Sequence, residues 1–126
     1  MALLLDTHAF LWWVQDDPKL TRRARRAIAD EDCALSLASC WEMAIKVRLG
    51  KLEVPVPVER FIQKQVELNG FSLLPISLEH ASRVADLPFH HRDPFDRLLV
   101  AQAMVEAVPL VTCDPKISPY PITRIW

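Results

Sequence analysis

Short apolar runs alternate with segments of helical spacing along the whole chain, and this alternation restricts the fold more than any other feature. The runs have the length and composition of buried strands. They lie at residues 2–5, 33–37, 71–76 and 109–113, with an edge strand expected at 122–125. Helices are expected at residues 9–15, 19–30, 39–49, 58–69, 77–86 and 94–105. The alternation predicts an α/β fold with three α/β/α layers and a mostly parallel sheet of four to five strands.

Length and composition favour one domain over residues 1–126, because half of the 126 residues are apolar and can form a core. The formal net charge of −1 argues against a generally basic surface for nucleic acid. The three cysteines lie far apart among apolar neighbours, which is typical of reduced thiols in a cytoplasmic protein. The apolar N-terminal run has no basic leader and is interrupted at Asp6, so we expect neither a signal peptide nor a membrane anchor.

Two acidic residues mark the start of the helix at 94–105. Pro94 suits the first helical position, which makes Asp93 the N-cap and places Asp96 in the first turn. This pattern has a purely structural explanation, since acids at a helix start satisfy and stabilise free N–H groups. Chemistry and capping are therefore equally compatible with these two residues alone.

Other acids follow predicted strands. Asp6 and Asp114 come directly after the first and fourth strands, and Glu42 lies near the start of the helix that follows the second. The carboxyl ends of parallel strands meet at one sheet edge, so Asp6, Glu42, Asp96 and Asp114 are expected to converge there. Glu42 also has two structural explanations, a capping box with Ser39 and an i,i+4 pair with Lys46.

A carboxylate cluster is unfavourable without a cation, because like charges resist joint ionisation. Oxygen ligands favour Mg²⁺ or Mn²⁺, which suits hydrolysis of a phosphodiester. Thr7 and Thr112 could hydrogen-bond a bound water or phosphate, or be ordinary strand-end residues. Lys46 and Arg97 could neutralise phosphate, but without substrate we expect them to pair with the acids.

Several other sites are weaker. Only two glycines are present, so a glycine-rich nucleotide loop is not expected. Adjacent His90 and His91 project in different directions and do not predict a zinc site. His8 is expected to pack at the strand end.

Two helix faces have open interpretations. The basic arc at residues 22–26 is either a solvated face or a track for a phosphate backbone. The helix at 9–15 is apolar on every side, so it is covered either by its own neighbours or by another chain.

Four segments together resemble the PIN-domain family, and within it the VapC-like ribonuclease toxins of prokaryotic toxin–antitoxin pairs. They are LLLDTH, SCWEMAIKVRLGKL, HHRDPFDRLLVAQA and PLVTCDP, in this order along essentially the whole chain. The resemblance implies a PIN-like α/β/α domain, Mg²⁺- or Mn²⁺-dependent cleavage of RNA, a homodimer, and inhibition by a small antitoxin whose C-terminal segment covers the acidic pocket. The family's acids fall on Asp6, Glu42, Asp96 and Asp114, with Asp93 as a cap that orients the site.

Two alternatives remain beside a metal-dependent ribonuclease toxin. A non-catalytic interaction module of the same fold would use the acids only as helix caps. A metal-dependent phosphatase would act on small phosphomonoesters instead of RNA.

Overall fold

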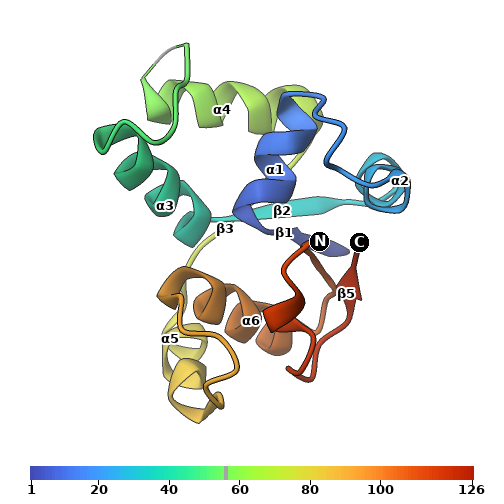
Figure 1. The fold of residues 1–126 in the computed structure, drawn as a ribbon, viewed down its shortest axis with the longest axis vertical. Helices are drawn as coiled ribbons and strands as arrows, with labels where there is room; N and C mark the ends of the chain where they lie inside the picture. Colours follow the sequence, from blue (N-terminus) through green and yellow to red (C-terminus); the bar gives the residue numbers. More distant parts are fainter. Residues whose placement is uncertain (56) are drawn as a thin grey trace.

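The sheet is the centre of the molecule. The structure, a computed structural model, describes residues 1–55 and 57–126. Within them five strands form one all-parallel sheet in the order β3-β2-β1-β4-β5 (Figure 1). The strands are β1 (Leu3–Leu5), β2 (Cys33–Ser36), β3 (Ser72–Leu74), β4 (Leu110–Val111) and β5 (Arg124–Ile125). The predicted α/β class and parallel sheet are confirmed, although each strand is shorter than its apolar run.

Helices cover both faces of this sheet. The α-helices are α1 (Thr7–Val14), α2 (Arg22–Asp30), α3 (Leu37–Arg48), α4 (Val58–Asn69), α5 (Leu78–Arg83) and α6 (Pro94–Glu106). Two 3₁₀ turns, η1 (Val84–Asp86) and η2 (Pro115–Ile117), follow α5 and β4. In Figure 1 the first four helices lie above the sheet, whereas α5 and α6 lie below it.

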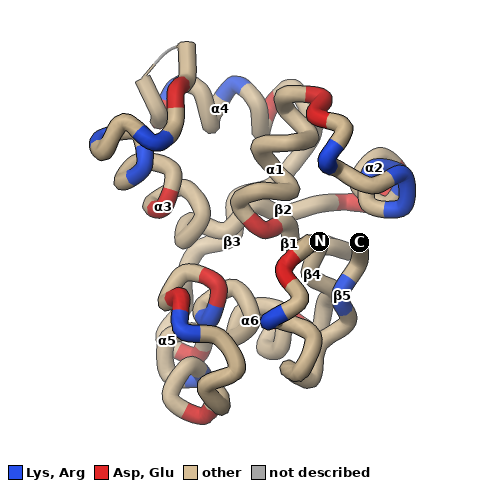
Figure 2. The backbone as a smooth tube through the Cα atoms, in the orientation of Figure 1, with Lys and Arg blue, Asp and Glu red and all other residues tan. Residues whose placement is uncertain are grey.

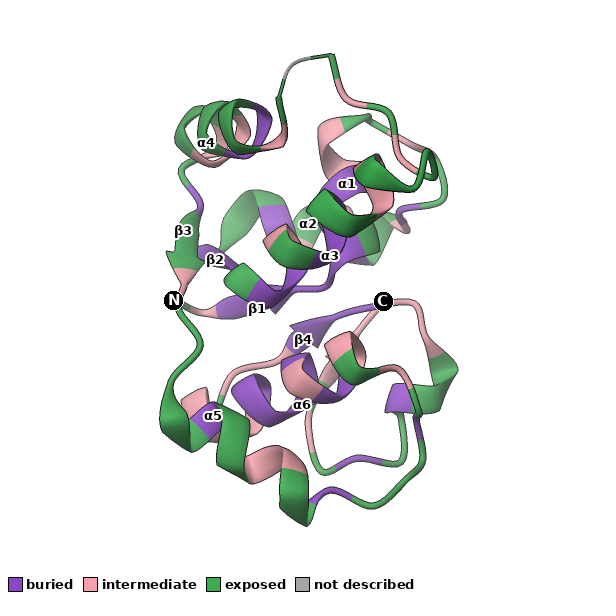
Figure 3. Ribbon diagram, turned by 90° about the vertical axis from the view of Figure 1, so that its left-hand side faces the viewer, coloured by how far each residue is buried: buried purple, intermediate pink, exposed green. Residues whose placement is uncertain are grey.

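Side-chain alternation along the strands divides the interior into two cores. Leu3 and Leu5 belong to the core beneath α1, α2, α3 and α4, whereas Leu4 belongs to the core against α6. Leu4 and Leu5 are fully buried, as expected for a strand with helices on both faces. Figure 3 shows the same distribution, with β1 and β4 buried and the outer side of α4 exposed.

The start of α3 differs from the prediction. Ser36, the last residue of β2, caps this helix by accepting a hydrogen bond from the Ala38 N–H at 3.0 Å. Ser39 therefore lies buried inside the helix, and the capping box predicted for Ser39 and Glu42 is wrong. Ser36 is both the last residue of β2 and the N-cap of α3, so no loop separates the strand from the helix. Ser36 is therefore the cap, and Ser39 is not. Glu42 consequently lies in the second turn.

The apolar helix α1 is covered largely by its own chain. Trp12 packs against Trp126 with ring centroids 5.7 Å apart, and Trp13 packs against Phe71 while its indole N–H donates to Asn69 at 2.9 Å. Of the two coverings expected for this helix, the structure therefore shows the intramolecular one. Among the residues described, no helix has the length and apolar composition needed to cross a membrane.

The cysteines share a free state and a raised pKa of their thiols. Cys33, Cys40 and Cys113 are free, and burial raises the pKa of Cys33 and Cys40 to about 11. Both thiols are therefore protonated at neutral pH, in agreement with the expectation of reduced, structural cysteines.

Candidate functional site

Asp6 lies at the carboxyl end of β1 and is almost completely buried. It caps α1, because its Oδ1 accepts a hydrogen bond from the Ala9 N–H at 2.7 Å. Burial raises the pKa of Asp6, and the nearby charge of Glu42 acts in the same direction, whereas a hydrogen bond from the Thr112 side chain acts against it. The centre of the sheet edge therefore holds a carboxylate for which ionisation is unfavourable without a cation.

Glu42 is held from two sides. The Thr7 hydroxyl donates to its Oε1 at 2.6 Å, and the Lys46 ammonium lies 2.9 Å from its Oε2. The Thr7 bond joins α1 to α3, while Lys46 lies one turn further along α3, at the i,i+4 spacing predicted for this pair. These two contacts therefore fix both oxygens of the Glu42 carboxylate.

Asp96 lies in the first turn of α6, three residues after the N-cap. Asp93 is this cap and accepts hydrogen bonds from the Phe95 and Asp96 N–H groups at 2.8 and 3.2 Å. Burial raises the pKa of Asp96 to about 7, and the charges of Asp93, Asp6 and Glu42 contribute while His91 opposes them. The charges of Asp6 and Glu42 act on Asp96, although no direct contact joins Asp96 to either of them among the described residues.

Asp114 completes the group from the other side. It follows β4 and caps η2, with its Oδ1 accepting from the Lys116 N–H at 3.0 Å. The Thr112 hydroxyl oxygen accepts from the Asp114 N–H at 3.1 Å, so Thr112 connects Asp114 with Asp6. Burial acts to raise the pKa of Asp114, but hydrogen bonds from Lys116 and His91 outweigh it and lower this pKa below 3.8.

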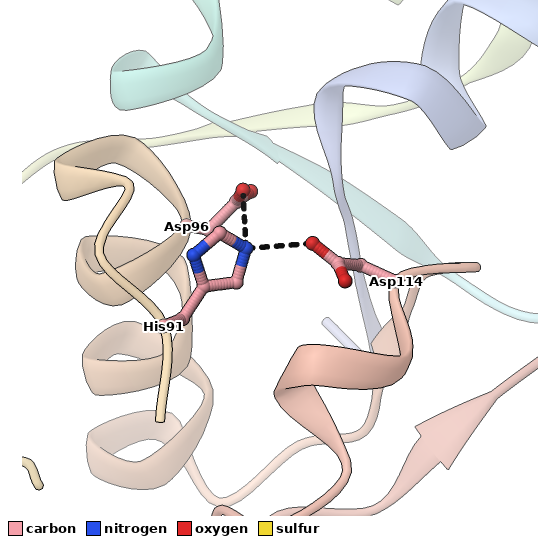
Figure 4. A group of neighbouring side chains, drawn as sticks. All are labelled: His91, Asp96 and Asp114. Atoms are coloured by element: carbon pink, nitrogen blue, oxygen red, sulfur yellow. Dashed lines mark hydrogen bonds and ion pairs between the residues drawn. The ribbon is translucent and has the colours of Figure 1, made fainter. Parts of the chain in front are cut away.

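His91 joins Asp96 and Asp114, and the sequence reasoning missed it. Its Nε2 lies 2.6 Å from Asp114 Oδ2 and 3.2 Å from Asp96 Oδ2 (Figure 4). The three side chains offer ligand atoms that all lie within 4.8 Å of one another. The only signal in the sequence was local, a histidine two residues before the helix cap, and its contact with Asp114 crosses 23 positions.

Arg97 does not pair with the acids, contrary to the prediction. Its guanidinium is buried and donates to backbone carbonyl oxygens, including those of Pro88 and His91 at 3.0 and 3.3 Å. The same group lies 4.2 Å from the centroid of the Phe89 ring. The guanidinium therefore binds backbone carbonyl oxygens of the segment before α6, and among the described residues it forms no ion pair with the acids.

The remaining charged candidates lie elsewhere. His8 is exposed and packs on Trp12, with centroids 5.4 Å apart, instead of being enclosed at the strand end. Helix α2 contributes Arg22, Arg23 and Arg26 to a hollow of about 880 Å³ that also includes the residues at the starts of β1 and β4. The acids follow the opposite ends of these strands, so the basic arc does not border the acidic site (Figure 2).

The donor set fits a divalent cation that prefers oxygen ligands. Four carboxylates come from four separate segments, and two of them have a pKa raised by burial. A bound cation would stabilise the ionised carboxylates against both this burial and their mutual repulsion. Carboxylate oxygens of Asp96 and Asp114, with the ring nitrogen of His91 beside them, are ligand types that suit a divalent cation.

Comparisons with known proteins agree with the observed fold. The family model described as "PIN domain" matches residues 3–121. The Mycobacterium tuberculosis protein named Ribonuclease VapC22 is 29% identical, over 99% of this chain and 98% of the relative. The solved structure of VapBC2 from Rickettsia felis, bound to a promoter DNA fragment, matches with a TM-score of 0.70 and 17% identity over 98% of this chain and 97% of that one. A toxin–antitoxin complex from Klebsiella pneumoniae matches with a TM-score of 0.63 and 19% identity over 95% and 93%.

Proposed function

The chain belongs to the PIN domain family, and from this premise we propose that it is a metal-dependent endoribonuclease and the toxin of a toxin–antitoxin pair. Asp6, Glu42, Asp96 and Asp114 are the proposed metal-binding and catalytic residues, with Mg²⁺ or Mn²⁺ as the cofactor. The observation that supports the proposal is the approach of Asp96 and Asp114, which come from different segments and offer ligand atoms within 4.8 Å of each other and of His91. Asp6 and Glu42 follow the neighbouring parallel strands β1 and β2 at the same edge of the sheet.

The supporting residues have distinct roles in this proposal. Thr7 and Lys46 fix the two oxygens of Glu42, and Thr112 connects Asp6 with Asp114. Asp93 holds the first turn of α6, which carries Asp96. A bound divalent ion would supply a more acidic water and stabilise charge on the phosphate oxygens. The chain itself orients the carboxylates and keeps Asp6 shielded from bulk water.

Two features support the proposed partners. The Klebsiella pneumoniae neighbour is a toxin–antitoxin complex by its printed title, and the Mycobacterium tuberculosis relative is named a ribonuclease. Helix α3 also exposes an apolar stripe, which a second copy of the chain would cover in a homodimer. The stripe consists of Leu37, Trp41, Ile45 and Leu49, which are between 37% and 61% exposed. Residues 1–126 are proposed to act as one cytoplasmic domain.

The decisive experiment compares Asp96→Asn with the matched control Asp30→Asn, an exposed acid on α2. Both purified variants and the unaltered protein are offered structured RNA and a phosphomonoester, with Mg²⁺ or Mn²⁺ and again with EDTA. We expect RNA cleavage that EDTA stops, a loss of about 100-fold or more in Asp96→Asn, and no change in Asp30→Asn.

Each alternative has its own outcome in this assay. RNA cleavage that survives both EDTA and Asp96→Asn would refute the proposal. Hydrolysis of the phosphomonoester alone would indicate a phosphatase. An interaction module would cleave neither substrate, and Mg²⁺ would not raise its melting temperature.

A further inference from the structure

The loop that carries His91 is fixed from behind by two buried side chains, Arg97 and Tyr120. The Arg97 guanidinium donates to four backbone carbonyl oxygens at 3.0 to 3.3 Å. These belong to Val84, Leu87, Pro88 and His91. The Tyr120 hydroxyl donates to the Pro88 carbonyl at 2.7 Å and accepts from the His91 N–H at 3.0 Å. The backbone of His91 is therefore held at both its N–H and its carbonyl oxygen.

The orientation of the His91 ring is fixed as well. The Asp93 N–H donates to His91 Nδ1 at 3.0 Å, so Nδ1 acts as an acceptor. The proton of a neutral ring then lies on Nε2. This N–H donates to Asp114 Oδ2 at 2.6 Å, and Asp96 Oδ2 lies 3.2 Å from the same ring nitrogen (Figure 4).

We propose that His91 is a positioning residue, which holds the Asp114 carboxylate through its ring N–H beside the contacting carboxylate of Asp96 and is not itself a metal ligand. The inference rests on the proposed metal site. A histidine that binds metal through Nε2 must leave a lone pair there and carry its proton on Nδ1. In this structure that proton would face the Asp93 N–H, so the backbone of the helix cap excludes this tautomer.

The arrangement gives His91 a specific task. Asp96 and Asp114 belong to different segments, α6 and the start of η2, and among the described residues His91 is the side chain that contacts both carboxylates. Donors that orient ligand carboxylates commonly change metal affinity by 10- to 100-fold when they are removed. The buried pair Arg97 and Tyr120 extends this support to the backbone behind the site.

Metal binding tests the role of the side chain. Calorimetry of the full chain with Mn²⁺ compares the unaltered protein with His91→Ala, His91→Gln and the control His90→Gln. His90 is exposed and packs on the Tyr120 ring with centroids 5.1 Å apart. We expect about a tenfold weaker Kd in His91→Ala, a partial recovery in His91→Gln through its amide N–H, and no change in the control.

Urea unfolding of the same variants separates positioning from folding, because a purely structural role would lower the unfolding midpoint and leave the Mn²⁺ affinity unchanged. Unchanged or tighter Mn²⁺ binding in His91→Ala would overturn the proposal. So would a His91→Gln variant that binds no better than His91→Ala.

The position of the ring proton gives a second test. Ring ¹⁵N chemical shifts at one fixed pH should show Nε2 protonated in the metal-free protein and again with saturating Mg²⁺. A proton on Nδ1 in the metal-free protein, or its loss from Nε2 when Mg²⁺ is added, would overturn the assignment of His91. Failure of the unaltered protein to bind Mn²⁺ would instead refute the proposed metal site, while the ring proton of the metal-free protein still reports on His91 as a donor.

Discussion

The two sides of the acidic site are supported in different ways. On one side, Glu42 is held by the hydroxyl of Thr7 and by Lys46, one turn further along the same helix. On the other, Asp96 and Asp114 share His91, whose backbone is held by the buried Arg97 and Tyr120. The Glu42 side therefore depends on few contacts, one of them within a single helix. The Asp96 side depends on a hydrogen-bond network that joins three separate parts of the chain.

This difference has a consequence for stability and function. A partly exposed ion pair within one helix contributes little to folding, because solvent screens it. A buried network costs much more when one member is lost, because the remaining polar groups lose their partners. Mutations on the Asp96 side should consequently affect folding and metal binding together, whereas those on the Glu42 side should affect the site with a smaller loss of stability.

The largest expected effect comes from removing the centre of the network. Arg97→Met should lower the free energy of unfolding by about 3 kcal/mol, because the buried carbonyl oxygens of Leu87 and His91 lose the guanidinium as their donor. Urea denaturation followed by circular dichroism measures this change. The control is Arg92→Met at an exposed position of the same loop. Equal stability of the two variants would show that the network does not hold the Asp96 side.

The pH dependence of the metal-free protein is the next largest effect. An unfolded Asp has a pKa near 3.8, whereas burial raises that of Asp96 to about 7, so the native state binds more protons between these values. The free energy of unfolding should therefore fall as pH rises from 4 to 7. The full difference corresponds to about 4 kcal/mol, which the partial exposure of the carboxyl reduces to about 2 kcal/mol.

Thermal unfolding at several pH values in EDTA, compared between the unaltered protein and Asp96→Asn, measures this contribution. The variant should lose less stability over the same interval, because an amide does not titrate. Parallel curves for the two proteins would assign the dependence to other groups, among which Asp6 also has a raised pKa.

On the Glu42 side, Thr7→Val should have an intermediate effect. The substitution removes the hydroxyl that donates to Glu42 and nearly preserves shape, so we expect a loss of about 1 kcal/mol in stability. Mn²⁺ affinity should fall by several-fold, because Glu42 becomes free to turn toward Lys46. Calorimetry and urea denaturation measure both, with the exposed Thr123→Val as control. A loss as large as that of Arg97→Met would remove the distinction between the two sides.

The smallest effect should follow Lys46→Gln. The Lys46 side chain is 31% exposed, and pairs of this spacing contribute about 0.3 to 0.5 kcal/mol. Unfolding in low and high salt should show that the difference between this variant and the unaltered protein disappears as salt rises. A loss of stability that salt does not reduce would mean that Lys46 supports α3 through packing instead of charge.

The fold was predictable where local chemistry decides it. Apolar runs located all five strands, and Asp93 with Pro94 located the start of α6. The start of α3 was not predictable, because Ser36 and Ser39 both have the chemistry of a cap. Only the end of β2 determines which serine is used.

The candidate site shows the same division. Parallel strands and the rule for their carboxyl ends predict that Asp6 and Asp96 lie at the same edge of the sheet, and the charge of Asp6 does act on Asp96. The role of Arg97 could not be predicted, since a guanidinium beside two acids in the sequence ordinarily pairs with them. Its actual partners are backbone carbonyls, and the sequence contains no mark of which carbonyls a loop leaves without donors. His91 was missed for a related reason, because its partner Asp114 lies beyond a whole helix and a strand.

The order of the strands determines when the acidic site can be completed during translation. The central strand is made first, but its neighbour β4 and the residues Asp114 and Tyr120 lie near the end of the chain. A ribosome that releases a truncated product would therefore produce a protein lacking both the fourth acid and the hydroxyl behind His91. Such a product would lack one of the four proposed metal-binding acids as well as the support behind His91.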